Sequence, residues 1–326
     1  MALFGMRFDF RVPDWAPGTA AERYAAALDM AQYAERMGFL FVNLSEHHGS
    51  PDGYCPSPLP VAAAMAARTT QLKIMISAMI PSFHDPIRLA EDIAVVDLIA
   101  NGRVDVVLTN GYVASEFDMF GVALKERPSR TTRCVEVLRR AWSGEPFEHE
   151  GRTIQVTPTP SAKGGPPIKL GGSTEAAARR AARIADGLVP SNPEIFEFYR
   201  DELRLLGKPD PGPYLGTDTG IVHLAEDADE GWAQLAPHAM HEVNAYGRWA
   251  IEAGTGTAGG YDTFDDPEEL RASGRYRVLT PDDMVAELKD GGPFAFSMFH
   301  PLIGGLPPEL GWRSLELLEH EVVPRL

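Results

Sequence analysis

The sequence predicts an α/β fold, a (β/α)8 TIM barrel, from three observations. Short runs of β-branched and aromatic residues alternate with longer segments of helical spacing, which is typical of repeated βα units and a parallel sheet. Eight such runs occur, and 326 residues suffice for a barrel formed as a single domain over residues 1–326. The alternative is an open doubly wound sheet, but its usual G-x-G-x-x-G sequence is absent after the first run.

Each of the first four expected strands is followed by an expected helix, and two of these helices have recognisable end signals. Thr19 is the expected N-cap of the first helix and Gly38 its end, while Asn101-Gly102 suits a left-handed end of the third helix. The second strand is apolar on both faces, as expected between a barrel interior and its outer helices. The expected strands are 7–12, 39–44, 72–79 and 104–108, with helices from 20 and at 60–69, 86–99 and 130–142.

The second half continues this pattern with two irregularities. The segment FEHEGRTIQV resembles a hairpin inserted before strand five. Residues 253–273 are rich in Gly, Thr and Asp and lack an apolar period, which predicts a long mobile loop at about 253–277, after strand seven. Such a loop is either a lid over the strand ends or a surface insertion. The expected strands are 168–170, 187–189, 217–224 and 295–298, with helices at 175–184, 196–206 and 314–322.

The composition excludes several classes of protein. The chain has 46 Asp+Glu against 30 Lys+Arg and a net charge of −16, which argues against a nucleic-acid partner. No stretch approaches the roughly 20 apolar residues of a membrane helix, so no membrane partner is expected. Cys55 and Cys134 are far apart, and the N-terminus lacks the pattern of a secretory signal. We therefore expect a cytoplasmic protein.

Residues that follow the strands of a barrel form one mouth. The triplet Glu46-His47-His48 follows strand two and places an acid beside two imidazoles that titrate near neutral pH. One histidine could act as a general base, or both could have only a structural hydrogen-bonding role. A metal site would need further ligands at suitable spacing, and none is expected.

The tetrapeptide Gly171-Gly172-Ser173-Thr174 lies between strand five and the helix at 175–184. Glycines permit close backbone approach, hydroxyls donate hydrogen bonds, and the first amides of a helix attract anions, so a phosphate would fit here. The alternative is that Ser173 or Thr174 only caps the helix.

Several segments together carry a resemblance to a known family. The chain contains, in order, GFLFVNLSEHHGSPDGYCPSPLPVAAAMAART, LKIMISAMIPSFHDPIRLAEDIAVVDLIANGRVDV, NGYVASEFDMFGV, EVLRRAWSGEPFEHEGR and PIKLGGSTEAAARRAARIADG. This order resembles the bacterial luciferase-like, flavin-dependent monooxygenases over most of residues 1–190. Weaker similarity recurs in LTPDDMVAELK and SLELLEHEVVPRL.

The resemblance implies a barrel that holds reduced FMN in its mouth, where O2 forms a C4a-peroxyflavin that oxidises an organic substrate. His47 is then the catalytic histidine, with Glu46 beside it. The Ser77-Ala78 bond is then a non-prolyl cis peptide beneath the flavin ring. The implied cofactor-binding residues are Ser77, Ala78, Asn110, Gly111, Gly171, Gly172, Ser173 and Thr174.

One position departs from the family pattern. Many relatives have Arg-Gly after strand four, where this chain has Asn110-Gly111, and asparagine supplies no charge for a phosphate. The cofactor could therefore be the deazaflavin coenzyme of a sister branch that transfers hydride, although the EHH triplet is more similar to the oxygen-using branch. A non-catalytic flavin-binding subunit is a third alternative.

The same resemblance suggests partners and a substrate class. With no nicotinamide-binding fingerprint of its own, the chain is expected to receive reduced FMN from an NAD(P)H-dependent flavin reductase. Relatives pair through the helices after strands two and three, here PVAAAMAAR and IRLAEDIAVVDLI, so we expect a homodimer. The expected substrate is a small apolar organic molecule. The residues expected to line its pocket, which are equally typical of a barrel core, are Phe8, Phe10, Met75, Phe83 and Phe299.

Overall fold

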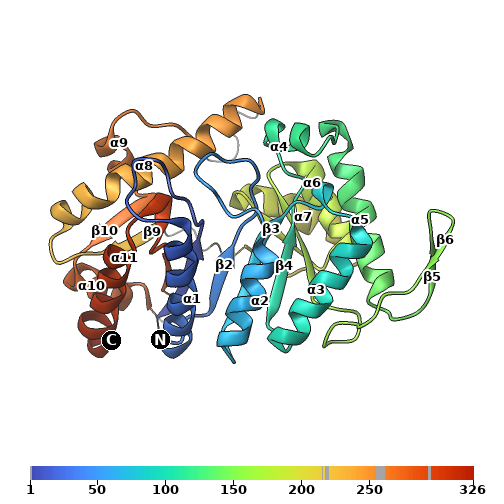
Figure 1. The fold of residues 1–326 in the computed structure, drawn as a ribbon, viewed down its shortest axis with the longest axis horizontal. Helices are drawn as coiled ribbons and strands as arrows, with labels where there is room; N and C mark the ends of the chain where they lie inside the picture. The colour runs from blue at the N-terminus through green and yellow to red at the C-terminus, as the bar shows by residue number, and fades with distance from the viewer. Residues whose placement is uncertain (1, 215, 217–219, 255–260, 293–294) are drawn as a thin grey trace. The chain divides into compact units, whose positions relative to one another are not determined.

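Parallel strands with flanking helices make this an α/β fold, as the sequence predicts (Figure 1). The computed structural model describes residues 2–214, 216, 220–254, 261–292 and 295–326. The chain divides into two compact units, one of residues 1–56, 217–248 and 261–326 and the other of residues 57–216 and 249–260. No helix in the described ranges is long and apolar enough to cross a membrane. That the chain acts as a single domain stays a prediction.

The first unit contains five parallel strands in the order β10-β9-β11-β1-β2. The strands are β1 (Leu3–Phe8), β2 (Phe41–Leu44), β9 (Ile221–Leu224), β10 (Tyr276–Leu279) and β11 (Phe296–Phe299). The helices are α1 (Ala20–Arg36), α8 (Ala228–Glu252, whose last turn belongs to the second unit), α9 (Pro267–Ala272), α10 (Pro281–Asp290) and α11 (Pro308–Leu317). Short helical turns also occur at Ile303–Gly305, Leu318–Val322 and Val323–Arg325.

Helix α8 is held in the first unit by its apolar face. Trp232, Leu235 and Val243 of α8 are buried in one cluster with Tyr276 of β10 and Leu306. Burial of large side chains of this kind contributes about 1.5–3 kcal/mol each. The cluster therefore fixes the rotation of α8 and, with it, the direction of the polar residues on its other face.

The second unit contains four parallel strands in the order β3-β4-β7-β8 and an antiparallel hairpin. The strands are β3 (Lys73–Met79), β4 (Val104–Leu108), β5 (Phe147–His149), β6 (Arg152–Ile154), β7 (Ile168–Gly172) and β8 (Gly187–Pro190). The helices are α2 (Pro58–Arg68), α3 (Pro86–Ala100), α4 (Ala114–Met119), α5 (Arg127–Ala141), α6 (Glu175–Ile184) and α7 (Pro193–Leu205), with turns at Pro81–Phe83 and Leu124–Glu126. The hairpin β5–β6 extends away from the helices of its unit (Figure 1).

Local signals place several helix ends where the sequence predicts them. Thr19 caps α1 and forms a capping box with Glu22. Asn101 ends α3 in the left-handed conformation, with φ 52°. The hairpin before strand five is confirmed, and β4 and α6 coincide with the predicted ranges 104–108 and 175–184.

Other predicted extents are wrong. The first strand is Leu3–Phe8 rather than 7–12, because the chain leaves the strand at Asp9 and Phe10 has a φ of 63°. The last helix begins at Pro308 instead of Ser314. The long helix α8, from Ala228, has no counterpart among the expected elements.

The expected loop at 253–277 is only partly irregular. It contains α9, capped by the Asp266 side chain, and the first residues of β10. Residues 255–260 of this range, and 217–219 of the expected seventh strand, lie outside the described residues. A lid function for the remaining residues stays a prediction.

Each unit buries one cysteine thiol. Cys55 lies in the first unit and Cys134 in the second. Burial raises the pKa of the Cys134 thiol to about 12. At neutral pH this side chain is therefore an unreactive thiol.

Candidate active site

The predicted catalytic pair lies directly after β2, in the first unit. The Glu46 side chain is fully buried, and its Oε1 lies 2.9 Å from Nε2 of His48. His47 is 8% exposed, and its ring packs edge-on against the rings of Tyr54, at 4.7 Å, and Tyr246, at 5.7 Å. The structure thus pairs Glu46 with the second histidine and surrounds the first with phenol rings.

The two phenols beside His47 form a hydrogen-bonded pair. The hydroxyls of Tyr54 and Tyr246 lie 2.8 Å apart, and Nη2 of Arg7 donates to the Tyr246 hydroxyl at 2.6 Å. The Tyr261 ring stacks on Tyr246 with centroids 5.4 Å apart. Burial raises the pKa of Tyr246 well above its ordinary value despite the opposing charge of Arg7. At neutral pH this phenol therefore remains a hydrogen-bond donor.

A second ion-pair group lies in the loop that carries Tyr54. Asp52 Oδ2 is 2.5 Å from Nη1 of Arg11 and 2.7 Å from Nε2 of His241. Burial alone would raise the pKa of the Asp52 carboxyl, but the His241 hydrogen bond and the Arg11 charge hold it well below its usual range. Asp52 therefore stays ionised and fixes Arg11 over the Tyr54 ring, 4.4 Å from its centroid.

A buried imidazole lies between two buried carboxylates in the same unit. His300 Nδ1 is 3.7 Å from Oε1 of Glu242, and its Nε2 is 3.7 Å from Oδ2 of Asp9. Arg7 lies 3.0 Å from Glu242, and the Tyr276 hydroxyl donates to Glu242 at 2.8 Å. Burial raises the pKa of Asp9, but His300 and Arg11 outweigh it and lower that pKa to about 2.

The donor atoms of Asp9, Glu242 and His300 lie close enough together to hold a metal ion. The geometry fits an ion-pair network better. His300 turns a different ring nitrogen toward each carboxylate. Arg7 and Arg11 already supply positive charge to Glu242 and Asp9.

Sequence reasoning missed most of this group. The residues it did not identify are Arg7, Asp9, Arg11, Asp52, Tyr54, His241, Glu242 and Tyr246. One signal was present, because His238, Glu242 and Tyr246 recur at a spacing of four and would lie on one face of a helix. Three pocket-lining candidates, Phe8, Phe10 and Phe299, are at most 1% exposed and belong to the core.

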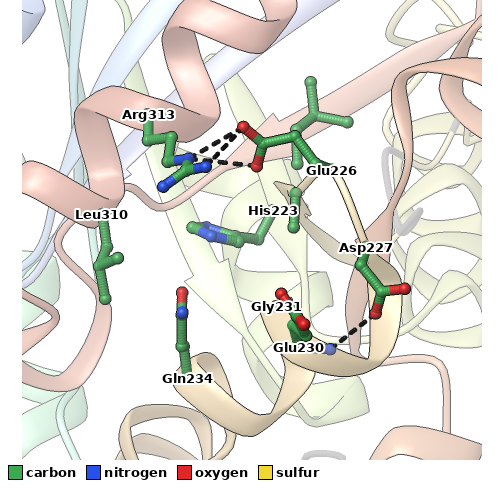
Figure 2. Close-up of a pocket in the computed structure, with 10 residues that line it drawn as sticks. His223, Glu226, Asp227, Glu230, Gly231, Gln234, Leu310 and Arg313 are labelled. Atoms are coloured by element: carbon green, nitrogen blue, oxygen red, sulfur yellow. Dashed lines mark hydrogen bonds and ion pairs between the residues drawn. The ribbon is translucent and has the colours of Figure 1, made fainter.

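A separate small cavity lies at the carboxyl end of β9 in the same unit. It has a volume of about 60 Å³, enough for a few water molecules, and is bounded by the first turns of α8 and by Leu310 and Arg313 of α11 (Figure 2). Arg313 is paired with Glu226, 2.7 Å away. His223 points into this cavity (Figure 2). Burial, and next the charge of His238, lower the pKa of His223 to about 4, so its imidazole is neutral at physiological pH.

The predicted cofactor residues lie in the second unit, at the carboxyl ends of β3, β4 and β7. The Ser77-Ala78 bond is cis, as the resemblance implies. The pairing of β4 with β7 aligns Leu108 with Leu170, so Asn110 and Gly172 follow at adjacent strand ends. Gly111 has a φ of 74°, and a Cβ there would lie 2.9 Å from Cγ2 of Ile80. Glycine is therefore required at this position.

The tetrapeptide after β7 has a structural role in addition to any binding role. The Thr174 side chain caps α6 by accepting from the Ala177 amide at 3.2 Å. The capping interpretation is thus confirmed for Thr174, whose hydroxyl hydrogen remains available to donate. Ser173 is exposed beside it. A Cβ on Gly172 would lie 2.8 Å from Cβ of Ala177, so glycine lets α6 begin close to the strand.

Comparisons with known proteins agree on one family. A family model described as luciferase-like monooxygenase matches residues 4–288. The chain is 25% identical to an FMNH(2)-dependent dimethylsulfone monooxygenase of Pseudomonas fluorescens, over 88% of this chain and 86% of that protein. It is 28% identical to an F420-dependent glucose-6-phosphate dehydrogenase of Nocardia farcinica, over 92% and 93% of the two chains.

Solved structures share the fold over nearly the whole chain. The crystal structure of monooxygenase RslO1 from Streptomyces bottropensis is 26% identical, covers 99% of both chains and has a TM-score of 0.71. By contrast, the chain spans less than half the length of two further curated relatives, proteins y4vJ and y4wF of Sinorhizobium fredii, 48% and 41% respectively, at 31% identity to each.

Proposed function

The chain belongs to the luciferase-like monooxygenase family, and from this premise we propose that it is a flavin-dependent monooxygenase that uses reduced FMN and O2 to oxidise a small apolar organic substrate. The observation that carries the proposal is the environment of His47. Its imidazole is almost fully buried against the hydrogen-bonded phenols of Tyr54 and Tyr246. A buried histidine packed against hydrogen-bonded phenols suits proton transfer.

The roles of the residues follow from this environment. When bound, reduced FMN supplies the electrons for the reaction with O2. His47 holds or transfers a proton at the reacting atoms, and the phenols of Tyr54 and Tyr246 keep its ring in one orientation. Glu46 acts through its neighbour His48, 2.9 Å away, by fixing the loop that carries His47.

The groups at the ends of β4 and β7 suit the phosphate of FMN. They are the Asn110 amide, the Ser173 hydroxyl and the first amides of α6, all able to donate hydrogen bonds. The acidic residue in the first turn of α6, Glu175, is paired with Arg179 at 2.7 Å. The donor set therefore favours an anion. Ser77, Ala78, Gly111 and Gly171 are proposed to contact the rest of the cofactor.

The second candidate is hydride transfer with the deazaflavin coenzyme. Two observations favour it: Asn110 stands where an arginine is expected, and one full-length relative is named an F420-dependent dehydrogenase. A third candidate is a non-catalytic subunit, which would bind flavin through the phosphate site but would not turn over a substrate.

The deciding experiment is an anaerobic fluorescence titration with FMN, reduced FMN and the deazaflavin coenzyme, followed by oxygen-uptake assays with aldehydes, ketones and sulfones. The monooxygenase proposal expects the tightest binding for reduced FMN and substrate-dependent oxygen uptake. Preference for the deazaflavin would establish the second candidate. Binding of FMN without turnover in any assay would favour the third.

Two partners complete the proposal. A separate NAD(P)H-dependent reductase would supply reduced FMN, and one relative is named an oxygenase component.

A homodimer would cover the outer face of α3, where Val95, Leu98 and Ile99 are 43–46% exposed. Light scattering on the wild type and on a Val95→Glu/Ile99→Glu variant tests this: the wild type should be dimeric and the variant monomeric.

A further inference from the structure

Helix α6 carries three arginines, of which two are ion-paired. Arg179 lies 2.7 Å from Glu175 and 3.1 Å from Glu202. Arg183 lies 2.8 Å from the other oxygen of Glu202. Within the described part of the chain, Arg180 has no ion pair, and its Nη1 donates a hydrogen bond to Oδ1 of Asn110 at 3.3 Å. The hydrogen-bond partner of Arg180 is thus Asn110, the uncharged residue that departs from the family pattern.

No described residue compensates the charge of Arg180, which lies in a half-buried position. Burial lowers the pKa of its guanidinium, and the neighbouring charge of Arg183 lowers it further. A guanidinium nevertheless remains charged at any physiological pH. Removing a charge from water without an opposite charge is unfavourable, and an anion bound beside it would offset that penalty.

Other donors converge on the same place. The Asn110 amide and the start of α6 are adjacent because β4 and β7 are paired up to Leu108 and Leu170. Arg127 of α5 donates from Nη1 to the Gly111 carbonyl oxygen at 3.2 Å and likewise has no ion pair among the described residues. In a chain with 46 acidic residues, two arginines at one loop that pair with no described carboxylate indicate a site for an external anion.

We infer that Arg180 binds the phosphate of the flavin cofactor, supplying from α6 the guanidinium that position 110 lacks. This inference rests on the proposed function. The ligand chemistry is a phosphomonoester dianion, which gains most from a charge-assisted bond. Arg180 would therefore select FMN over riboflavin, which has the same ring system and no phosphate.

The test compares the affinities of Arg180→Gln and wild-type protein for FMN and for riboflavin by fluorescence titration. Loss of the guanidinium should weaken FMN binding by about tenfold or more and leave riboflavin binding within about twofold. Arg183→Gln is the matched control, since it removes an arginine of the same helix that is paired with Glu202, away from the first turn, and it should change neither affinity.

A double variant tests whether an arginine at a different position restores FMN binding. In Arg180→Gln/Asn110→Arg, the guanidinium returns to the same site from β4, and FMN affinity should recover most of what the single variant lost. Recovery would show that charge at this site holds the phosphate.

Two results would overturn the inference: an equal loss of FMN and riboflavin binding in Arg180→Gln, or no preference for FMN over riboflavin in the wild type. A wild type that binds the deazaflavin coenzyme but not FMN would overturn the proposed function instead. The same variants, titrated with that coenzyme and with its phosphate-free deazariboflavin, would then decide the role of Arg180. A chain that binds none of these compounds would overturn both.

Discussion

The hydroxyls of Tyr54 and Tyr246 lie 2.8 Å apart although the two residues are 192 positions apart in the chain. This contact ties α8 to the loop after β2, next to His47. Changing either residue to phenylalanine should reduce the free energy of unfolding by about 1 kcal/mol. Because both variants remove the same hydrogen bond, the double variant should lose less than the sum, as measured by urea denaturation of all four proteins. Fully additive losses would mean that the hydroxyls do not interact in solution.

His47→Ala should lower turnover by about 100-fold or more, the usual effect of removing a general acid or base. FMN affinity should change little, because the proposed phosphate contacts are on other residues. Oxygen-uptake kinetics and fluorescence titration measure the two effects separately. His320→Ala, which removes an exposed imidazole near the C-terminus, is the control. Unchanged turnover in His47→Ala would remove this residue from the mechanism.

Asp9 should make folding stability depend on pH in acid. Its pKa is lowered from 3.8 to about 2 in the folded protein. The unfolded chain therefore binds more protons between these values, and stability rises with pH across this window. The contribution, about 2 kcal/mol, is complete above the unfolded pKa and is lost as pH falls through the folded one. Denaturation of wild type and Asp9→Asn from pH 2 to pH 6 checks this, since the variant should show a flatter profile.

Gly111→Ala should destabilise the protein more than Gly121→Ala. Both glycines have a positive φ, 74° and 64°. An added Cβ at Gly111 would meet Ile80 at 2.9 Å, whereas at Gly121 it would meet nothing within 4 Å. The backbone penalty of about 1–2 kcal/mol is common to both variants, and overlap adds about 1–3 kcal/mol at Gly111. Equal melting temperatures for the two variants would contradict the crowding at Gly111.

The sequence predicted those parts of the fold that depend on local interactions. Thr19 and Glu22 are close in sequence, and Asn101 takes its left-handed conformation at a helix end without help from distant residues. Helix α8 was missed because Pro237 lies inside it and its polar residues resemble a surface pattern. Its stability comes from tertiary contacts such as that of Trp232 with the β10 region.

The candidate site follows the same division. Glu46 and His47 are adjacent in sequence, and residues 171–174 form one tetrapeptide, so both segments were identified. The partners of these residues come from long-range packing, as Tyr246 and Arg180 show. Nothing local to Asn110 indicates that an arginine 70 positions away reaches its side chain. Such pairings depend on strand order and helix rotation, which periodicity alone does not determine.

The buried thiols allow the opening of each unit to be followed separately. A cysteine-specific alkylating reagent reaches Cys55 or Cys134 only when the surrounding structure opens. Mass spectrometry of the modified peptides would therefore measure the rate of opening of the two units separately, in one sample and without an engineered cysteine. If flavin binding slows alkylation at Cys134 more than at Cys55, the ligand stabilises chiefly the unit that contains Arg180.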